Sequence, residues 1–202
     1  MKKNASDEKT TGACILKRPL FVFCGIRRFC VRPSGLPNAP VCRLNGARLV
    51  VISEPSEHRR KFAAEMGFTT PDPFGVGFDA RLSELTQGHG FDVFFDAAGA
   101  INALNVCVEN TKPTGHVVVI AISGTPYPLD LGKIFMKELN LVGVRIHTYY
   151  DFKSTAELVS GGALNEEPGT MISGVFSLDE VIQAFDYATT DASAFKTLVR
   201  VN

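Results

Sequence analysis

Residues Gly46–Gly67, GARLVVISEPSEHRRKFAAEMG, decide the fold that we expect for this chain. Leu49–Ile52 is a continuous apolar run, which is typical of a strand buried on both faces of a parallel sheet. Ser56 is a good N-cap for a following helix, which we predict over Glu57–Met66 and which Gly67 ends. The stretch therefore predicts one strand–helix unit of an α/β protein.

The same alternation of apolar strands and helices continues along the middle of the chain. Further strands are expected at Phe91–Phe95, His116–Ile122 and Leu141–Val144. The expected helices that accompany them are Asp79–Gln87, Gly99–Asn110, Leu129–Leu139 and Asp151–Ser160. Strands that alternate with helices in this way predict a doubly wound parallel sheet of the Rossmann type.

The C-terminal part, residues 166–202, departs from this pattern. Its expected elements are a strand, an amphipathic helix and a strand, at Met171–Phe176, Leu178–Thr189 and Phe195–Val201. A strand–helix–strand unit of this size buries too little apolar surface to form a core alone. We therefore expect a domain at 46–165 and a separate, smaller unit at 166–202.

The N-terminal segment, residues 1–45, is basic and irregular. Up to Arg48 the chain has ten Lys and Arg against two acids, whereas the remainder has eleven against nineteen, although the formal net charge of all 202 residues is zero. Leu20–Cys24 is an expected strand. Gly25–Asn45 contains three prolines and scattered arginines, and it predicts no helix.

Composition and cysteine spacing bound the class of protein. A hydrophobic content of 45% without an apolar run long enough to span a bilayer indicates a soluble globular chain. The five cysteines lack the close pairs of zinc ribbons, and their odd number does not suggest a secreted disulfide framework, so we expect a cytoplasmic protein. The basic N-terminal segment lacks periodic or aromatic patterning, so we expect neither nucleic acid nor membrane as a partner.

Five stretches in register resemble the zinc-dependent medium-chain dehydrogenase/reductase family, in its alcohol, sorbitol and butanediol dehydrogenase branch. They are Gly46–Gly67, FDVFFDAAGA (Phe91–Ala100), GHVVVIAIS (Gly115–Ser123), KELNLVGVRIH (Lys137–His147) and FSLDEVIQAFDYA (Phe176–Ala188). The resemblance implies an oxidoreductase that transfers hydride from a secondary alcohol to NAD. It also implies that 46–165 is the cofactor-binding domain and that 166–202 is a remnant of the GroES-like catalytic domain.

The resemblance implies a set of cofactor-binding residues. Glu54, directly after the first quoted strand, would bind the adenosine ribose and favour NAD over NADP, because its charge repels a 2′-phosphate. Arg59 would flank the adenine or its ribose, and together with Arg60 it leaves room for NADP. The other implied residues are Ala98 and Gly99 on the adenosine side, Ile122 and Ser123 near the nicotinamide, and Val144 and Arg145 closing over it. For Glu54 and the arginines, the alternative is a solvated charge without a ligand.

The sequence departs from this family in two ways. Between Leu20 and Gly46, where the family has a G-x-G-x-x-G turn, only Gly25 and Gly35 occur, so we expect an incomplete first βα unit and weak NAD binding. The family's zinc ligands and catalytic residues have no counterpart here, so we expect no catalytic residue and no metal ligand. We hypothesise that Leu20–Asn45 is translated from a shifted frame or a mis-joined exon.

Other patterns mimic known chemistry, and their context argues against them. Gly75–Ala80 matches G-x-G-x-x-A, but Pro71 and Pro73 disfavour the strand that must precede such a turn. Tyr149 and Lys153 have the spacing of the short-chain dehydrogenase pair, but the serine of that family is missing upstream. The four histidines are scattered, without metal-ligand spacing.

Two functions remain open at this point. One is an oxidoreductase that is active when a separate chain supplies the catalytic half. The other is a non-catalytic remnant that pairs with a full-length relative. In the family, dimers form across the stretch that matches Leu139–His147, so the resemblance implies a homo- or hetero-oligomer through this edge strand.

Overall fold

The computed structural model describes residues 20–24, 38–100, 102–124, 126, 128–163, 172–191 and 193–201. The predictions about the glycine-poor stretch between Cys24 and Asn38 lie outside these residues. The hypothesis of a shifted frame concerns Leu20–Asn45, and most of it also lies outside the described residues, because only 20–24 and 38–45 of that segment are described.

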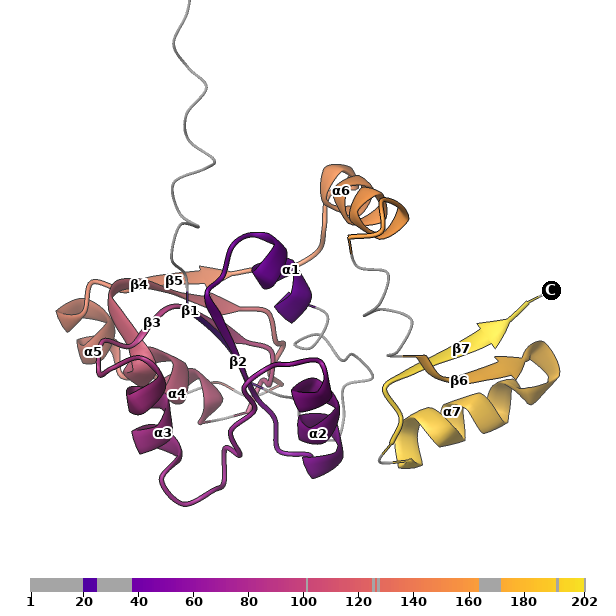
Figure 1. Ribbon diagram of the computed structural model, residues 1–202, viewed down its shortest axis with the longest axis horizontal. Coiled ribbons are helices and arrows are strands. Elements are labelled where there is room, and N and C mark those ends of the chain that lie inside the picture. The colour runs from indigo at the N-terminus through magenta and orange to yellow at the C-terminus, as the bar shows by residue number, and fades with distance from the viewer. Residues whose placement is uncertain are drawn as a thin grey trace, which may run out of the picture.

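Five parallel strands form one sheet, in the order β2-β1-β3-β4-β5 (Figure 1). Their bounds are β1 (Leu20–Cys24), β2 (Leu49–Ser53), β3 (Phe91–Asp96), β4 (Thr111–Val119) and β5 (Asn140–Gly143). The strand β1 pairs with β2 on one side and with β3 on the other, so the direction in which the chain builds the sheet reverses there. This topology confirms the predicted Rossmann-type parallel sheet.

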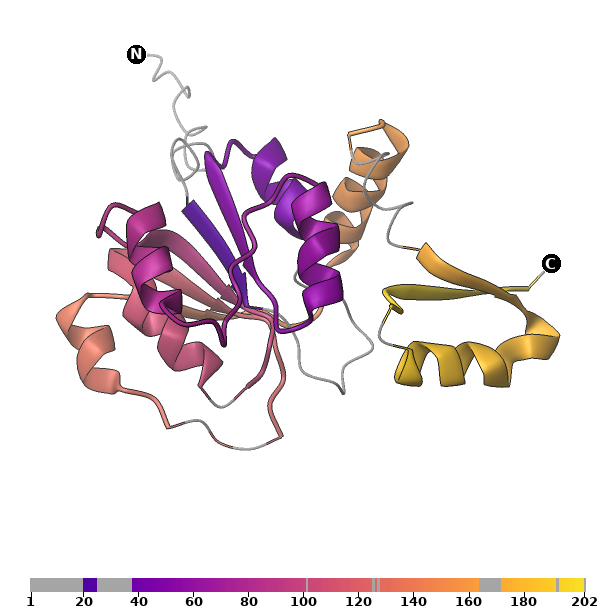
Figure 2. The ribbon, with the colours of Figure 1, turned by 60° about the horizontal axis from the view of Figure 1, so that its bottom comes forward.

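Helices cover the sheet on both faces (Figure 2). Their bounds are α1 (Asn38–Leu44), α2 (Glu57–Glu65), α3 (Phe78–Leu85), α4 (Ala103–Asn110) and α5 (Leu131–Met136). One core cluster joins α3, α4 and the edge of α5 to the sheet, and the other joins α1 and α2 to the opposite face. The apolar run of β2 serves both clusters, because Val51 belongs to the first and Val50 and Ile52 to the second.

Two elements differ most from the sequence predictions, and α4 and α5 are shorter than predicted. The helix α1 lies where no helix was predicted, and its Ala39 and Cys42 are buried against β2. Packing against the sheet therefore stabilises a helix whose own sequence gives little signal. The strand β4 begins at Thr111, before the predicted start, and a register irregularity between Phe91 and Val93 accommodates the extra residues.

The C-terminal unit is a parallel pair of strands, β6 (Ile172–Ser177) and β7 (Lys196–Arg200), with α7 (Val181–Thr190) packed on it. The rings of Phe176 and Tyr187 meet at a centroid distance of 5.6 Å inside this unit. The predicted strand–helix–strand order is therefore confirmed. The predicted boundary after residue 45 leaves β1 and α1 on its N-terminal side, although both belong to the sheet domain.

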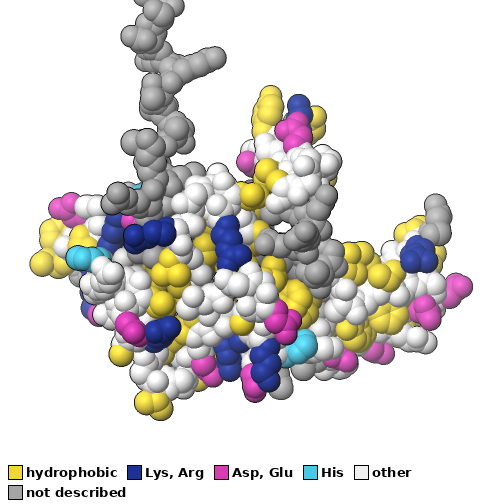
Figure 3. Space-filling view, viewed as in Figure 1, with side chains coloured by type: hydrophobic (Ala, Val, Ile, Leu, Met, Phe, Trp, Pro, Cys, Tyr) yellow, Lys and Arg dark blue, Asp and Glu magenta, His cyan; other side chains and the backbone are white. Residues whose placement is uncertain are grey.

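Apolar side chains remain exposed on α7 and on α6 (Tyr149–Ser160), which has no buried residue. Hydrophobic side chains gather over the C-terminal unit at the right of Figure 3 and near α5 at its left. Among the described residues, no helix is long and apolar enough to cross a bilayer.

Candidate functional site

The carboxyl ends of β2, β1 and β3 meet at the point where the strand order reverses, which is where ligands bind in open α/β sheets. Two buried acids lie there. Glu54 directly follows β2 and is 8% exposed, and Asp96 ends β3 and is 0% exposed. The predicted position of Glu54 at the end of a strand is therefore observed.

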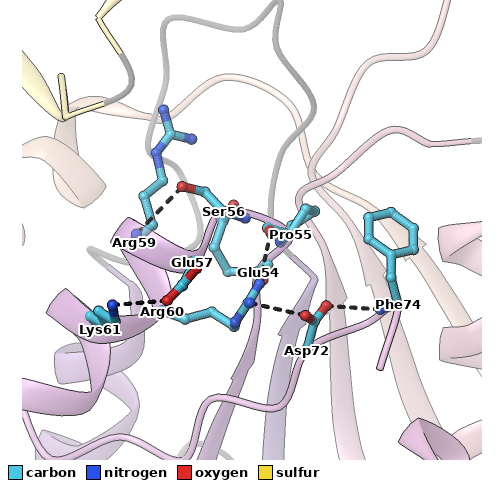
Figure 4. Close-up of polar contacts among 9 residues, drawn as sticks. All are labelled: Glu54, Pro55, Ser56, Glu57, Arg59, Arg60, Lys61, Asp72 and Phe74. Atoms are coloured by element: carbon cyan, nitrogen blue, oxygen red, sulfur yellow. Dashed lines mark hydrogen bonds and ion pairs between the residues drawn. The ribbon is translucent and has the colours of Figure 1, made fainter. Parts of the chain in front are cut away.

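The backbone that follows β2 turns so that Glu54 faces the start of α2 (Figure 4). The backbone N–H of Ser56 donates a hydrogen bond of 3.0 Å to Oε1 of Glu54. The Ser56 side chain in turn caps α2, accepting a hydrogen bond of 3.5 Å from the N–H of Arg59. Capping and the carboxylate contact together fix the position of the acid relative to the helix.

Arg60 stabilises this turn through hydrogen bonds to its backbone and an ion pair with Asp72. Its Nη1 donates hydrogen bonds of 2.8 and 2.7 Å to the carbonyl oxygens of Glu54 and Pro55, and its Nη2 lies 2.9 Å from Oδ2 of Asp72. The other Asp72 oxygen accepts a hydrogen bond of 2.9 Å from the N–H of Phe74 (Figure 4). The charge of Arg60 is therefore already paired, a role that sequence reasoning missed.

A cavity of about 700 Å³ opens beside this turn. Ser53 and Pro55 line it from the end of β2, Ala98 lines it from the loop after β3, and a third wall is the segment between Pro73 and Ala80. The sequence context argues against Gly75–Ala80 as a phosphate loop, and the residues before it, predicted as a loop or at best a short edge strand, pair with the sheet through an isolated bridge between Thr69 and Val51. The two glycines before a helix were the available signal that this loop approaches a site.

Asp96 shapes the cavity wall that contains Ala98. Its Oδ1 accepts hydrogen bonds of 2.9 and 3.2 Å from the N–H groups of Ala98 and Gly99, the two residues predicted on the adenosine side. Its Oδ2 is buried and has no hydrogen-bond partner. Burial raises the pKa of this carboxyl, against the lowering effect of the two N–H donors.

Arg59, predicted beside the adenine or its ribose, does not line the cavity. Its side chain points away from Glu54 and Asp72 in Figure 4 and lies against the C-terminal unit. The Nη2 atom donates a long hydrogen bond of 3.5 Å to the carbonyl oxygen of Ala194, and the guanidinium carbon lies 5.9 Å from the ring centroid of Phe195. The predicted contact with the cofactor stays a prediction.

The four residues predicted near the nicotinamide lie at the same edge of the sheet, in the loops after β4 and β5. Ile122 and Ser123 follow β4, whereas Val144 and Arg145 follow β5. A hydrogen bond of 2.9 Å from the N–H of Val144 to the carbonyl oxygen of Val119 joins the two strand ends. Ile122, Val144 and Arg145 are exposed, so this end of the candidate site is open.

A zinc ion has no candidate ligand set in the part of the chain that the structure describes, because no three His, Cys, Asp or Glu side chains come together there. The buried thiol of Cys42 does not suit a metal, since burial raises its pKa to about 12 and favours the protonated form. The described residues therefore do not fit a zinc ion.

The sequence and the fold both match known dehydrogenases. The sequence model of a family described as zinc-binding dehydrogenase matches residues 35–161. A 2-dehydro-3-deoxy-L-galactonate 5-dehydrogenase of Pseudoalteromonas atlantica is 33% identical over 170 residues, which is 84% of this chain and 49% of the relative. An (R,R)-butanediol dehydrogenase of Neisseria gonorrhoeae is 32% identical over 84% of this chain and 48% of the relative. The chain thus spans about half the length of these relatives.

Solved structures agree on the fold. The 2R,3R-butanediol dehydrogenase of Bacillus subtilis superimposes with a TM-score of 0.82 at 23% identity, covering 95% of this chain and 53% of that one. A protein of Sinorhizobium meliloti that is assigned as a zinc-binding dehydrogenase and was solved with bound NADP gives a TM-score of 0.77 at 26% identity, covering 94% of this chain and 54% of that one.

The raised pKa of Asp96 predicts a dependence of stability on pH. Above the usual aspartate range, the folded protein still holds a proton that the unfolded chain has lost, so the contribution of Asp96 to stability falls as pH rises through this interval. Thermal denaturation of wild type and Asp96→Asn between pH 4.5 and 7.5 measures this effect. We expect the melting temperature of the variant, relative to that of the wild type, to increase as pH rises. A constant difference across the range would contradict the assignment.

Proposed function

Because this chain belongs to the zinc-binding dehydrogenase family, we propose that it is the NAD-binding part of an alcohol or polyol dehydrogenase. When bound, the nicotinamide of the cofactor accepts a hydride from a secondary alcohol. The observation that carries the proposal is the buried Glu54 beside the cavity at the carboxyl ends of β2 and β3. A reducing, cytoplasmic setting is part of the proposal, since Cys42 is a buried free thiol.

We place the adenosine end of the cofactor in the cavity. Pro55, Phe74 and Ala98 offer apolar walls to the flat face of an adenine ring. The carboxylate of Glu54 accepts hydrogen bonds and therefore suits the ribose hydroxyls. Its charge repels a 2′-phosphate, so we propose NAD rather than NADP. The NADP in the Sinorhizobium meliloti neighbour is a reason to test both cofactors.

The nicotinamide end is proposed at the loops after β4 and β5. Exposed Ile122 and Val144 give apolar surface to one side of a ring, and Ser123 and Arg145 place a hydroxyl and a cation near its amide or the phosphates. The backbone of Ala98 and Gly99, fixed by Asp96, lies between the two ends. Because the sequence between Cys24 and Asn38 lacks the family's glycine turn, we propose that dinucleotide binding is weak.

We propose that catalysis needs a zinc-holding part that the described residues do not supply. Either that part lies outside the described residues, in the same polypeptide or in a separate chain, or the chain is a non-catalytic member that associates with a full-length relative. The second reading is favoured by β5, a strand that pairs with β4 on one side and is exposed along its whole length.

The segment 139–147 is the proposed contact for a second subunit. Leu141, Val142, Val144 and Ile146 are all exposed there, so an apolar strand edge faces solvent. Exposed, apolar sheet edges pair with other chains, because their N–H and C=O groups lack strand partners. A homo- or hetero-oligomer through this edge therefore accompanies the proposal.

The first test is calorimetric titration of the purified chain with NADH. We expect binding weaker than micromolar, and we expect Glu54→Ala to weaken it at least about tenfold, since it removes charge-assisted hydrogen bonds to the ribose. Glu57→Ala is the control, because this carboxylate on α2 is exposed and pairs with Lys61 at 2.8 Å, whereas Glu54 is buried. Equal NADH affinity in wild type and Glu54→Ala would reject the proposed site.

Metal analysis tests whether this chain holds zinc itself. We expect the purified, dialysed chain to hold substoichiometric zinc by mass spectrometry, because the described residues contain no ligand set. Zinc at one equivalent per chain, retained against a chelator, would show that the chain carries its own metal site and would contradict this part of the proposal.

Sedimentation equilibrium tests the edge strand. We expect the wild type to dimerise and Val142→Lys to raise the dimer dissociation constant at least about tenfold, because a buried lysine in the strand interface is unpaired. Val76→Lys, in the exposed loop before α3, is the matched control and should leave the dimer intact. Equal association of all three proteins would place the interface elsewhere.

A further inference from the structure

Among the described residues, the C-terminal unit contacts the sheet domain chiefly through the side chain of Phe195 and the backbone of Ala194. The ring of Phe195, in the turn before β7, lies 4.5 Å from the ring of Phe62 and 5.6 Å from that of His58, both on α2. The guanidinium of Arg59 lies against the same ring, with its carbon 5.9 Å from the centroid. Phe195 therefore packs on the first two turns of the helix that begins directly after Glu54 and its turn.

Hydrogen bonds hold Arg59 only weakly in this position. Its contact with the carbonyl oxygen of Ala194 is 3.5 Å long, and its Nε–H is buried without a hydrogen-bond partner. An unsatisfied donor of a charged group is costly when buried. The contact with Phe195 is thus the main described interaction that keeps the guanidinium on this side of α2, and a better anion partner could compete for it.

The position of Arg59 decides which charges face the adenosine end of the cavity. Arg60 is already paired with Asp72 and with two carbonyl oxygens, so it has little capacity for a phosphate. Neither arginine lines the cavity, and Glu54 lies between Ser53 and Pro55, which do line it. In dinucleotide-binding folds, an arginine near this acid is what accommodates a 2′-phosphate.

We propose that Phe195 is a specificity-determining residue, which favours NAD over NADP by holding Arg59 against the C-terminal unit and away from the ribose. The inference rests on the proposed cofactor site and adds a determinant 141 positions after Glu54 in the sequence, outside the sheet domain. It assigns the discrimination to two effects: the carboxylate that repels a 2′-phosphate, and the absence of a cation that would attract one.

The same contact links cofactor choice to the docking of the C-terminal unit. A dinucleotide with a 2′-phosphate that draws Arg59 to itself must break the contacts of Arg59 with Ala194 and Phe195. NADPH binding therefore weakens the docking of the C-terminal unit on α2. By thermodynamic linkage, undocking of that unit strengthens NADPH binding by the same factor.

The test compares NADH and NADPH affinities by calorimetric titration of the whole chain in wild type, Phe195→Ala, Arg59→Ala and the double variant. We expect Phe195→Ala to raise the affinity for NADPH relative to NADH about tenfold, the effect of one new charge-assisted hydrogen bond. The double variant should lose this gain, because the gain needs the guanidinium. Arg59→Ala alone should leave the ratio of the two affinities nearly unchanged.

Phe185→Ala is the matched control, since this exposed ring on α7 is in the same unit and makes none of the described ring contacts with α2. Its affinity ratio should equal that of the wild type. An unchanged ratio in Phe195→Ala, or a gain that persists without Arg59, would overturn the inference. If the wild type binds neither cofactor, the proposed function fails. In that case NADPH binding by Phe195→Ala alone still supports the inference, and its absence rejects it.

Discussion

The burial of a parallel sheet on both faces is the constraint on which the rest of this structure depends. Successive residues of a strand point to opposite faces, so β2 can bury Val50, Val51 and Ile52 only if helices cover both sides. Helices on both sides require crossover connections, and these bring the carboxyl ends of β2, β1 and β3 together. Because of this topology, Glu54 and Asp96 lie close to residues that line the same cavity, Pro55 and Ala98.

The sequence pattern was sufficient to predict the buried strand β2, but it was insufficient to predict the helix α1. A continuous apolar run identified β2, because a strand buried on both faces of a parallel sheet needs no polar alternation. The helix α1 gave no such signal, since NAPVCRL is short and contains Pro40. Its existence depends on Ala39 and Cys42 packing against β2, which is tertiary information.

The candidate site divides in the same way. The position of Glu54 follows from the predicted end of β2, whereas Ala98 and Gly99 after β3 were implied by the family resemblance. The direction of Arg59 does not, because it is set by Ala194 and Phe195, which no local pattern brings to α2. The segment between Pro73 and Ala80 was not predicted as a cavity wall, although Gly75 and Gly77 before α3 were a local signal that this loop approaches a site.

The helix α2 contacts both the turn that contains Glu54 and the C-terminal unit, so a movement of the helix affects both contacts. Its N-terminal turn fixes Glu54 through Ser56, and its second face receives Phe195 against His58 and Phe62. A helix of nine residues is rigid over this length, so a ligand that moves its first turn also moves the surface on which the C-terminal unit rests. Cofactor binding and the docking of the C-terminal unit are therefore expected to influence each other through α2.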